Sequence, residues 1–97
     1  PVIVTGDLNA RPDAQAYAVL TGPGHRVGLR DACALVADPA APDTTYNGFA
    51  APRPGMRIDV VLLSAHWTAT AYRVDMTTES GRFASDHFPV AVVAHLS

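Results

Sequence analysis

Three short apolar runs set the strongest limit on what this chain can fold into. They are Val2–Thr5, Ile58–Leu63 and Phe88–Leu96. Each is dominated by valine, isoleucine, leucine or alanine, which is typical of strands that pack inside a sheet structure. We expect Val2–Thr5 to be buried on both faces. The longest apolar stretches are far too short to cross a bilayer, so we expect no transmembrane segment.

The remaining segments complete a mixed pattern of strands and helices. Residues Trp67–Val74 alternate in polarity as an amphipathic strand does, and Thr44–Tyr46 could form a short strand. Two segments have helical spacing of apolar residues, Asp13–Leu20 after a proline and Leu29–Val36. Strands dominate, with two helices in the first half. The sequence therefore predicts a layered α/β or α+β fold.

Composition excludes several classes of protein. The 97 residues make one domain at most, and the net charge is −2. All 7 basic residues are arginines, scattered along the chain, which argues against strong non-specific binding of nucleic acid by this chain alone. A nucleic-acid substrate remains compatible with this charge. Cys33 is the single cysteine, so the chain has no internal disulfide and no thiolate zinc site, and we expect a buried structural thiol.

The first polar cluster follows the first strand. Asp7 and Asn9 come after Gly6 and lie two residues apart, so in an extended chain their side chains project to the same side. A carboxylate and an amide placed in this way can hold a hard cation or a water molecule. The competing interpretation is an ordinary turn, because Asp and Asn are common turn residues.

Two further clusters carry ionisable groups. Asp59 interrupts an apolar strand, where a lone buried carboxylate costs several kcal/mol unless it is paired. It could instead face solvent on an edge strand or pair with Arg57. Asp86 and His87 stand just before the last strand, and a histidine can move a proton near neutral pH. The competing interpretation there is a turn with a partly buried histidine.

Taken together, the three clusters resemble the endonuclease/exonuclease/phosphatase superfamily, which has the deoxyribonuclease I-like fold. The resemblance rests on Gly6-Asp7-Leu8-Asn9, Arg57-Ile58-Asp59 and Ser85-Asp86-His87-Phe88-Pro89, which occur in the family's order. The segment Thr45-Tyr46-Asn47-Gly48-Phe49 also resembles one found between the first two motifs. The resemblance to this family implies a metal-dependent hydrolase of phosphodiesters or phosphomonoesters, with Mg²⁺ or Mn²⁺ as the cofactor.

The resemblance also implies a role for each matched residue. Asp7 would orient or deprotonate the attacking water, and Asn9 would donate hydrogen bonds to the phosphoryl oxygens. Asp59 would hold His87 in one tautomer, and His87 would contact the phosphate or transfer a proton. Asp7, Asn9 and Asp86 would ligate the metal or lie next to it.

The resemblance covers nearly the whole chain but only the C-terminal portion of the family's domain. It implies that residues 1–97 are part of a four-layer α/β sandwich with two mainly antiparallel sheets. The family's N-terminal half supplies an Asn and a Glu to the metal, whereas Glu79, the one glutamate here, matches no such motif. We therefore expect the chain to be inactive alone, with its missing half supplied elsewhere or replaced by self-association.

The motifs do not select a substrate. A nucleic acid, a phosphoinositide, a sphingolipid headgroup and a small phosphate ester are all compatible with them, and the scattered arginines favour duplex DNA least. The alternative function is a non-catalytic fragment or binding module that keeps the fold. The presence of the whole matched set of polar residues argues against that alternative.

Overall fold

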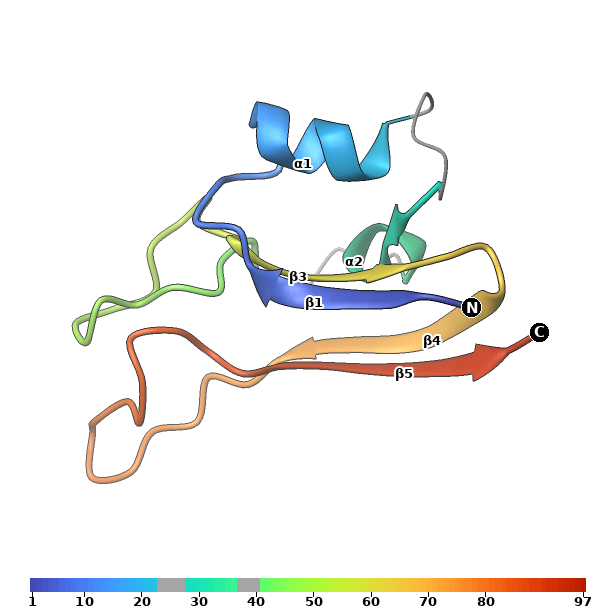
Figure 1. Cartoon of the computed structure of the whole chain (residues 1–97). Helices are drawn as coiled ribbons and strands as arrows, with labels where there is room; N and C mark the ends of the chain where they lie inside the picture. Colours follow the sequence, from blue (N-terminus) through green and yellow to red (C-terminus); the bar gives the residue numbers. More distant parts are fainter. Residues whose placement is uncertain (23–27, 37–40) are drawn as a thin grey trace.

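The computed structural model describes residues 1–22, 28–36 and 41–97. Its secondary structure is drawn in Figure 1. In chain order the elements are β1 (Ile3–Asp7), α1 (Gln15–Thr21), β2 (Arg30–Asp31), α2 (Ala32–Leu35), β3 (Asp59–Leu63), β4 (Trp67–Val74) and β5 (Val90–Leu96). No helix among the described residues is long and apolar enough to span a membrane.

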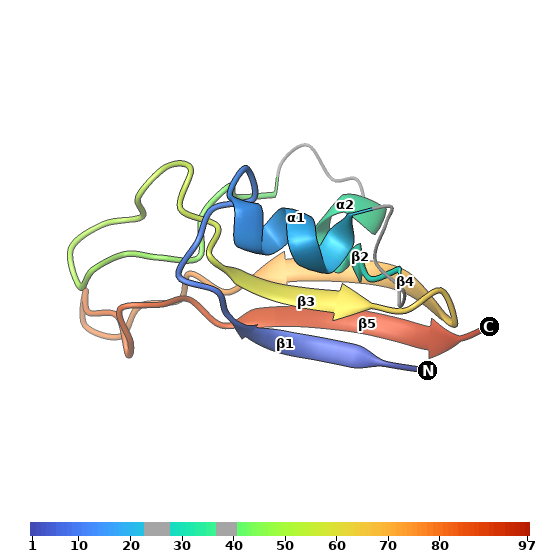
Figure 2. The same ribbon diagram turned by 45° about the horizontal axis from the view of Figure 1, so that its top comes forward.

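The strands form two antiparallel sheets. The first has the order β1-β3-β2, and the second consists of β4 paired with β5. Helix α1 lies over one face of the three-stranded sheet, and the β4–β5 pair lies against the other face (Figures 1 and 2). The predicted α+β class with two antiparallel sheets is confirmed. The described residues supply a helical layer and two sheet layers of such a sandwich.

The core follows from the two-residue period of β3. Val60 and Leu62 point to the helix side, where they pack with Leu29. Four partly buried residues close this cluster, namely Val4, Leu8, Tyr17 and Leu20. The alternate residues of β3 point toward the second sheet, and the first of them is Asp59. Strand β3 therefore holds the core with one face and carries a carboxylate on the other.

The predicted helix at Leu29–Val36 is wrong over its first residues. Arg30 and Asp31 form β2, which pairs with Leu63 and Leu62 of β3, and only α2 is helical. The Asp31 carboxylate is buried, and it accepts hydrogen bonds from the Tyr17 hydroxyl at 2.7 Å and the Cys33 backbone N–H at 3.0 Å. These tertiary contacts override the helical spacing of the apolar residues.

The expectation that β1 is buried on both faces is also wrong for this chain. Val2 is 43% exposed and Ile3 is 50% exposed. Strand β1 pairs with β3 on one side, and the described residues offer it no second strand. Val2 and Ile3 therefore remain in contact with solvent.

The observed bounds of other helices and strands differ from the predicted bounds by a few residues. Helix α1 begins at Gln15 rather than Asp13, because a turn that closes with the Ala14 N–H on the Arg11 carbonyl precedes it. Strand β5 begins two residues later than predicted, whereas β4 has its predicted bounds. The Thr44–Tyr46 strand is reduced to a single bridge between Tyr46 and His87.

Candidate active site

Two carboxylates face each other at the end of the first sheet. Asp7, the last residue of β1, pairs with Asp59, the first residue of β3, so their side chains lie on the same face. Two like charges directly opposite each other destabilise a sheet, and a sheet built for stability alone would avoid them. The side chain of Asp7 is 47% exposed and that of Asp59 is 21% exposed.

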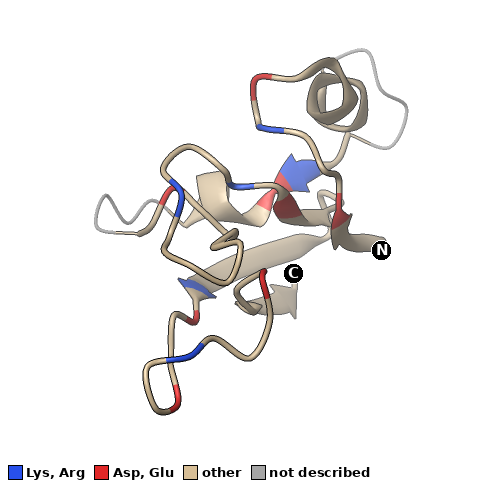
Figure 3. Ribbon diagram, turned by 90° about the vertical axis from the view of Figure 1, so that its left-hand side faces the viewer, with Lys and Arg blue, Asp and Glu red and all other residues tan. Residues whose placement is uncertain are grey.

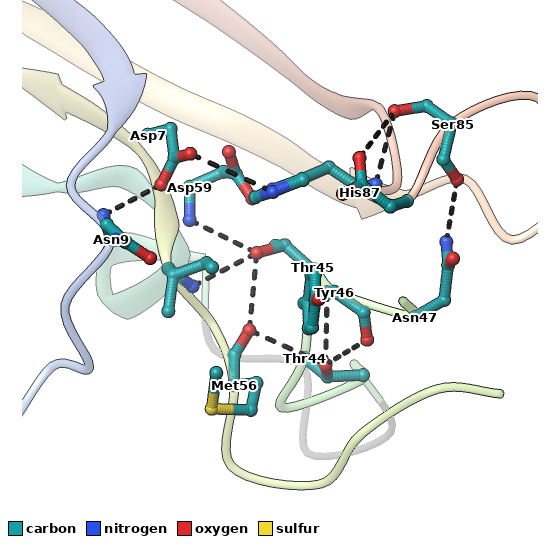
Figure 4. A network of polar contacts seen from close by, with 12 residues as sticks. Asp7, Asn9, Thr44, Thr45, Tyr46, Asn47, Met56, Asp59, Ser85 and His87 are labelled. Atoms are coloured by element: carbon teal, nitrogen blue, oxygen red, sulfur yellow. Dashed lines mark hydrogen bonds and ion pairs between the residues drawn. The ribbon is translucent and has the colours of Figure 1, made fainter. Parts of the chain in front are cut away.

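His87 bridges the two carboxylates. Its Nδ1 lies 2.8 Å from Asp59 Oδ2, a hydrogen-bond distance, and its Nε2 lies 3.8 Å from Asp7 Oδ2 (Figure 4). The hydrogen bond to Asp59 is the main cause that raises the pKa of His87, and the charges of Asp59, Asp7 and Asp86 raise this pKa further. The predicted Asp59–His87 pair is therefore present.

Backbone contacts fix the loop that carries His87. The Asn47 N–H donates to the Asp86 carbonyl at 2.8 Å, and the Phe88 N–H donates to the Thr45 carbonyl at 2.8 Å. The buried Asn47 side chain donates through Nδ2 to the Ser85 carbonyl at 3.0 Å. The Tyr46 ring also meets the His87 ring edge-on, with centroids 5.2 Å apart. The 45–47 segment thus anchors the residues on both sides of His87 in the chain, Asp86 and Phe88.

Thr45 joins this segment to Asp59. Its side chain is fully buried, and Oγ1 accepts hydrogen bonds from the backbone N–H groups of Ile58 at 3.0 Å and Asp59 at 3.1 Å (Figure 4). The same hydroxyl lies 3.4 Å from the Met56 carbonyl, to which it donates. The Thr45 hydroxyl thereby positions the start of β3, and the Thr45 backbone carbonyl, which accepts from the Phe88 N–H, positions the segment that leads into β5. Sequence reasoning did not give Thr45 this role.

Asn9 occupies a left-handed turn beside Asp7. Its φ is 47°, a conformation that Asn adopts more readily than most residues, and its N–H donates to Asp7 Oδ1 at 2.7 Å. The turn expected from the competing interpretation is thus present, together with the convergence of the carboxylates. Figure 4 shows Asn9 at the edge of the cluster, next to Asp7.

Arg57 does not pair with Asp59. Its guanidinium forms an ion pair with Asp31 at 2.7 Å on the helix side of the sheet. The pairing that the sequence left open for Asp59 is therefore taken by His87 instead. Arg57 serves the packing of β2 and α1, and the carboxylate of Asp59 remains available to the site.

The described residues contain one group whose ligand atoms could converge on a cation. Atoms of Asp7, Asp59 and His87 all lie within 4.8 Å of one another. The Asp86 carboxylate is outside this group, and its Oδ1 accepts a long hydrogen bond of 3.5 Å from the Ser85 hydroxyl. The carboxylate and amide oxygens of Asp7 and Asn9 are the donor types that Mg²⁺ and Mn²⁺ favour, so the residues present fit such an ion chemically.

The surroundings of the site are mixed in charge and partly hollow. Acidic and basic residues are interspersed on the loops at this end of the molecule (Figure 3). A cavity of about 390 Å³ lies between the two sheets, and its lining includes Asp7, Asp59 and Phe88. The carboxylates therefore open onto space that a small ligand could enter.

Comparisons with known proteins identify the family and similar folds. Residues 1–87 match the model of the Endonuclease/Exonuclease/phosphatase family. A search of curated protein sequences gives no match. A functionally unknown conserved protein from Enterococcus faecalis V583 has a solved structure that superimposes with a TM-score of 0.81, at 21% identity over 98% of this chain.

Two solved structures from Bacteroides thetaiotaomicron are also similar. An endonuclease/exonuclease/phosphatase family protein superimposes with a TM-score of 0.78, at 29% identity over 93% of this chain. The mannosyl-6-phosphatase of strain VPI-5482 also has a TM-score of 0.78, at 27% identity over 97% of this chain. The present chain spans only 36%, 34% and 37% of the three solved chains, in the order given.

Proposed function

The chain belongs to the endonuclease/exonuclease/phosphatase family, and we propose that it forms the C-terminal part of a domain that hydrolyses phosphate esters with a divalent metal ion. The convergence of Asp7, Asp59 and His87 carries this proposal. Such a site places two negative charges and a proton donor where two sheets meet, an arrangement that serves chemistry better than stability. We call a polypeptide that contains this chain together with the rest of the domain the complete domain.

Each residue of the site would have a distinct role in the hydrolysis. Asp7 would orient the attacking water or take its proton, and the Asn9 amide would donate to a phosphoryl oxygen as charge develops there. Water adds to phosphorus, the ester P–O bond breaks, and the alcohol leaves. Asp59 would keep His87 in one tautomer and favour its protonated form, so that His87 can contact the phosphate or transfer a proton.

Asp7 and Asn9, with Asp86 nearby, would hold the metal ion. Mg²⁺ or Mn²⁺ would neutralise the charge of the phosphoryl group when bound. The described residues supply few oxygen ligands for such an ion, so we expect the rest of the complete domain to supply further ones. This is the reason for proposing the metal site for the complete domain.

A small phosphomonoester is the substrate class that we favour. One structural relative is a mannosyl-6-phosphatase at 27% identity, and the loops around the site carry both signs of charge instead of a basic stripe. Neutralising many phosphates of a long nucleic acid requires clustered cations. A phosphoinositide or sphingolipid headgroup contains the same phosphate ester and is a second source of this chemistry.

The test is an assay of the complete domain on a phosphomonoester, a phosphodiester and single-stranded DNA. We expect the monoester to be hydrolysed fastest, and we expect EDTA to abolish turnover and Mg²⁺ or Mn²⁺ to restore it. Turnover that persists in EDTA would contradict the metal proposal. Binding of phosphate esters without any turnover would favour a non-catalytic binding module.

A further inference from the structure

Phe49 is held in a conformation and a place that packing does not explain. Its φ is 61°, in the left-handed region, which is uncommon for a bulky residue with a Cβ atom. The residue is 67% exposed, so its ring gains little by burial against the described residues. Backbone strain at an exposed aromatic residue is a feature of ligand-binding positions more often than of structural ones.

The contacts that hold Phe49 are those that place the catalytic histidine. The Phe49 N–H donates to the Asn47 side-chain carbonyl at 2.7 Å. The same Asn47 side chain donates to the Ser85 carbonyl, and its backbone N–H donates to the Asp86 carbonyl. The Phe49 backbone is therefore anchored relative to His87 through a single buried asparagine.

A second aromatic ring stands opposite Phe49. Phe49 and Ala50 line a hollow of about 400 Å³ together with Gly81, Arg82 and Phe83, and we call it the aromatic hollow. Phe83 meets the buried Phe88 ring edge-on, with centroids 5.2 Å apart, so its position is fixed from below. Arg82 is exposed, and among the described residues it forms no ion pair.

The aromatic hollow shares two lining residues with a hollow that reaches His87. A larger hollow of about 520 Å³ lies within residues 75–89, and Arg82 and Phe83 line it as well. His87 and Phe88 form part of its wall. Arg82 and Phe83 thus stand between the hollow that His87 lines and the hollow that Phe49 lines.

We propose that the aromatic hollow receives the alcohol portion of the substrate and selects phosphate esters whose alcohol carries a ring. Phe49 and Phe83 offer faces on which the apolar face of a sugar or the π-face of a base can stack. Arg82 supplies hydrogen-bond donors for polar groups at the ring edge. This proposal rests on the proposed function, because it assigns the group attached to the phosphate that His87 contacts.

The experiment compares ring-bearing and acyclic esters on the complete domain. The substrates are glucose 6-phosphate, a nucleoside 5′-monophosphate and ethyl phosphate, and the variants are Phe49→Gly and Phe83→Leu. Phe49→Gly removes the ring and also the strain, since glycine adopts positive φ freely. Val19→Ala is the control, because Val19 is an exposed apolar residue on α1 outside the hollow.

We expect the unaltered domain to prefer at least one ring-bearing ester, and Phe49→Gly to lower kcat/KM for it by about tenfold, the typical effect of one stacking contact. Turnover of ethyl phosphate should not change, and Tm should stay the same or rise. A preference for the sugar or for the nucleoside identifies the ring. An equal fall for ethyl phosphate, or a large fall in Tm, would show that Phe49 is structural and would overturn the proposal.

A binding measurement separates this proposal from the proposed function. Calorimetry with the matching non-hydrolysable phosphonates reports the preference for a ring without any turnover. If the domain hydrolyses none of the esters but binds the ring-bearing phosphonates more tightly, and Phe49→Gly removes that difference, the hollow is confirmed and the hydrolase proposal fails. Equal binding of ring-bearing and acyclic phosphonates overturns the hollow, whatever the activity.

Discussion

The loop end of the sheets is held by hydrogen bonds, whereas the β1 edge lacks the burial that would stabilise it. At the loop end, Asp59, His87 and Thr45 are joined by hydrogen bonds of 2.8 to 3.1 Å. At the β1 edge, Val2 and Ile3 are apolar and exposed, and among the described residues β1 pairs with β3 alone. The polar geometry of the site is thus encoded within these residues, whereas the burial that normally stabilises a strand is not.

This contrast has a physical basis. Hydrogen bonds are directional and short in range, so a few side chains can fix a polar cluster locally. Burial requires area on both sides of a sheet, and β1 finds a covering only where Val4 meets the core below α1. A chain can therefore hold a well-ordered site while an adjacent edge lacks cover. The predictions below test each side of this comparison, from the largest effect to the smallest.

The largest effect concerns the 97-residue chain by itself. We expect no measurable turnover of a phosphate ester in Mg²⁺, because the ligand set is incomplete, and we expect self-association through the uncovered β1 edge. Light scattering after size-exclusion chromatography, with a parallel assay, measures both. Ile3→Lys should reduce the association, since an edge lysine opposes strand pairing. A monomer that turns over substrate at enzyme-like rates contradicts both expectations.

The second prediction tests the loop end in the complete domain. Asp7→Asn, Asn9→Ala and His87→Ala should each lower kcat by roughly 10²–10⁴-fold, as the loss of a general base or a preorganised donor does. Cys33→Ala is the control and should leave turnover nearly unchanged, because Cys33 lies in α2 and is not part of the group formed by Asp7, Asp59 and His87. Near-normal activity of His87→Ala would refute its assigned role.

The third prediction concerns the hydroxyl of Thr45. Thr45→Val keeps the shape but leaves the N–H groups of Ile58 and Asp59 without an acceptor, which should lower the free energy of unfolding by about 2 kcal/mol. Because Asp59 moves with its backbone, we also expect kcat to fall while KM changes little. Thr70→Val, at an exposed position of β4, is the matched control. Denaturant unfolding and steady-state kinetics give the two readouts.

The sequence predicted the elements that depend on local pattern. The strand at β4 and the order of the polar clusters follow from alternation and motif spacing, and the Asp59–His87 pair follows from the family resemblance. The contribution of Thr45 did not, because its hydroxyl binds backbone groups 13 and 14 residues away, and that contact exists only after folding. Strand β2 was missed for the same reason, since the buried Asp31 and the pairing with β3 create it.

The metal-ligating role of Asp86 and the catalytic roles of the other residues remain predictions. Asp86 offers two groups with different surroundings. Its backbone carbonyl anchors Asn47, while its carboxylate lies outside the group formed by Asp7, Asp59 and His87. A metal titration of Asp86→Asn in the complete domain would distinguish a ligand from a structural residue.

The smallest effect is the pKa of His87. The hydrogen bond to Asp59 favours the protonated imidazole and raises the pKa above its ordinary value. A pKa that is higher in the folded state stabilises the fold fully below the unfolded pKa of about 6.5 and loses that contribution as the pH rises through the folded pKa. We therefore expect Asp59→Asn to lower the pKa of His87 and to flatten this part of the stability profile.

Asp13→Asn, at an exposed position before α1, should change neither quantity. An NMR titration of the complete domain in a chelating buffer measures the pKa, and urea unfolding at several pH values measures the stability. If the pKa of His87 stayed the same in Asp59→Asn, the hydrogen bond between Asp59 and His87 would not be setting the charge of the site.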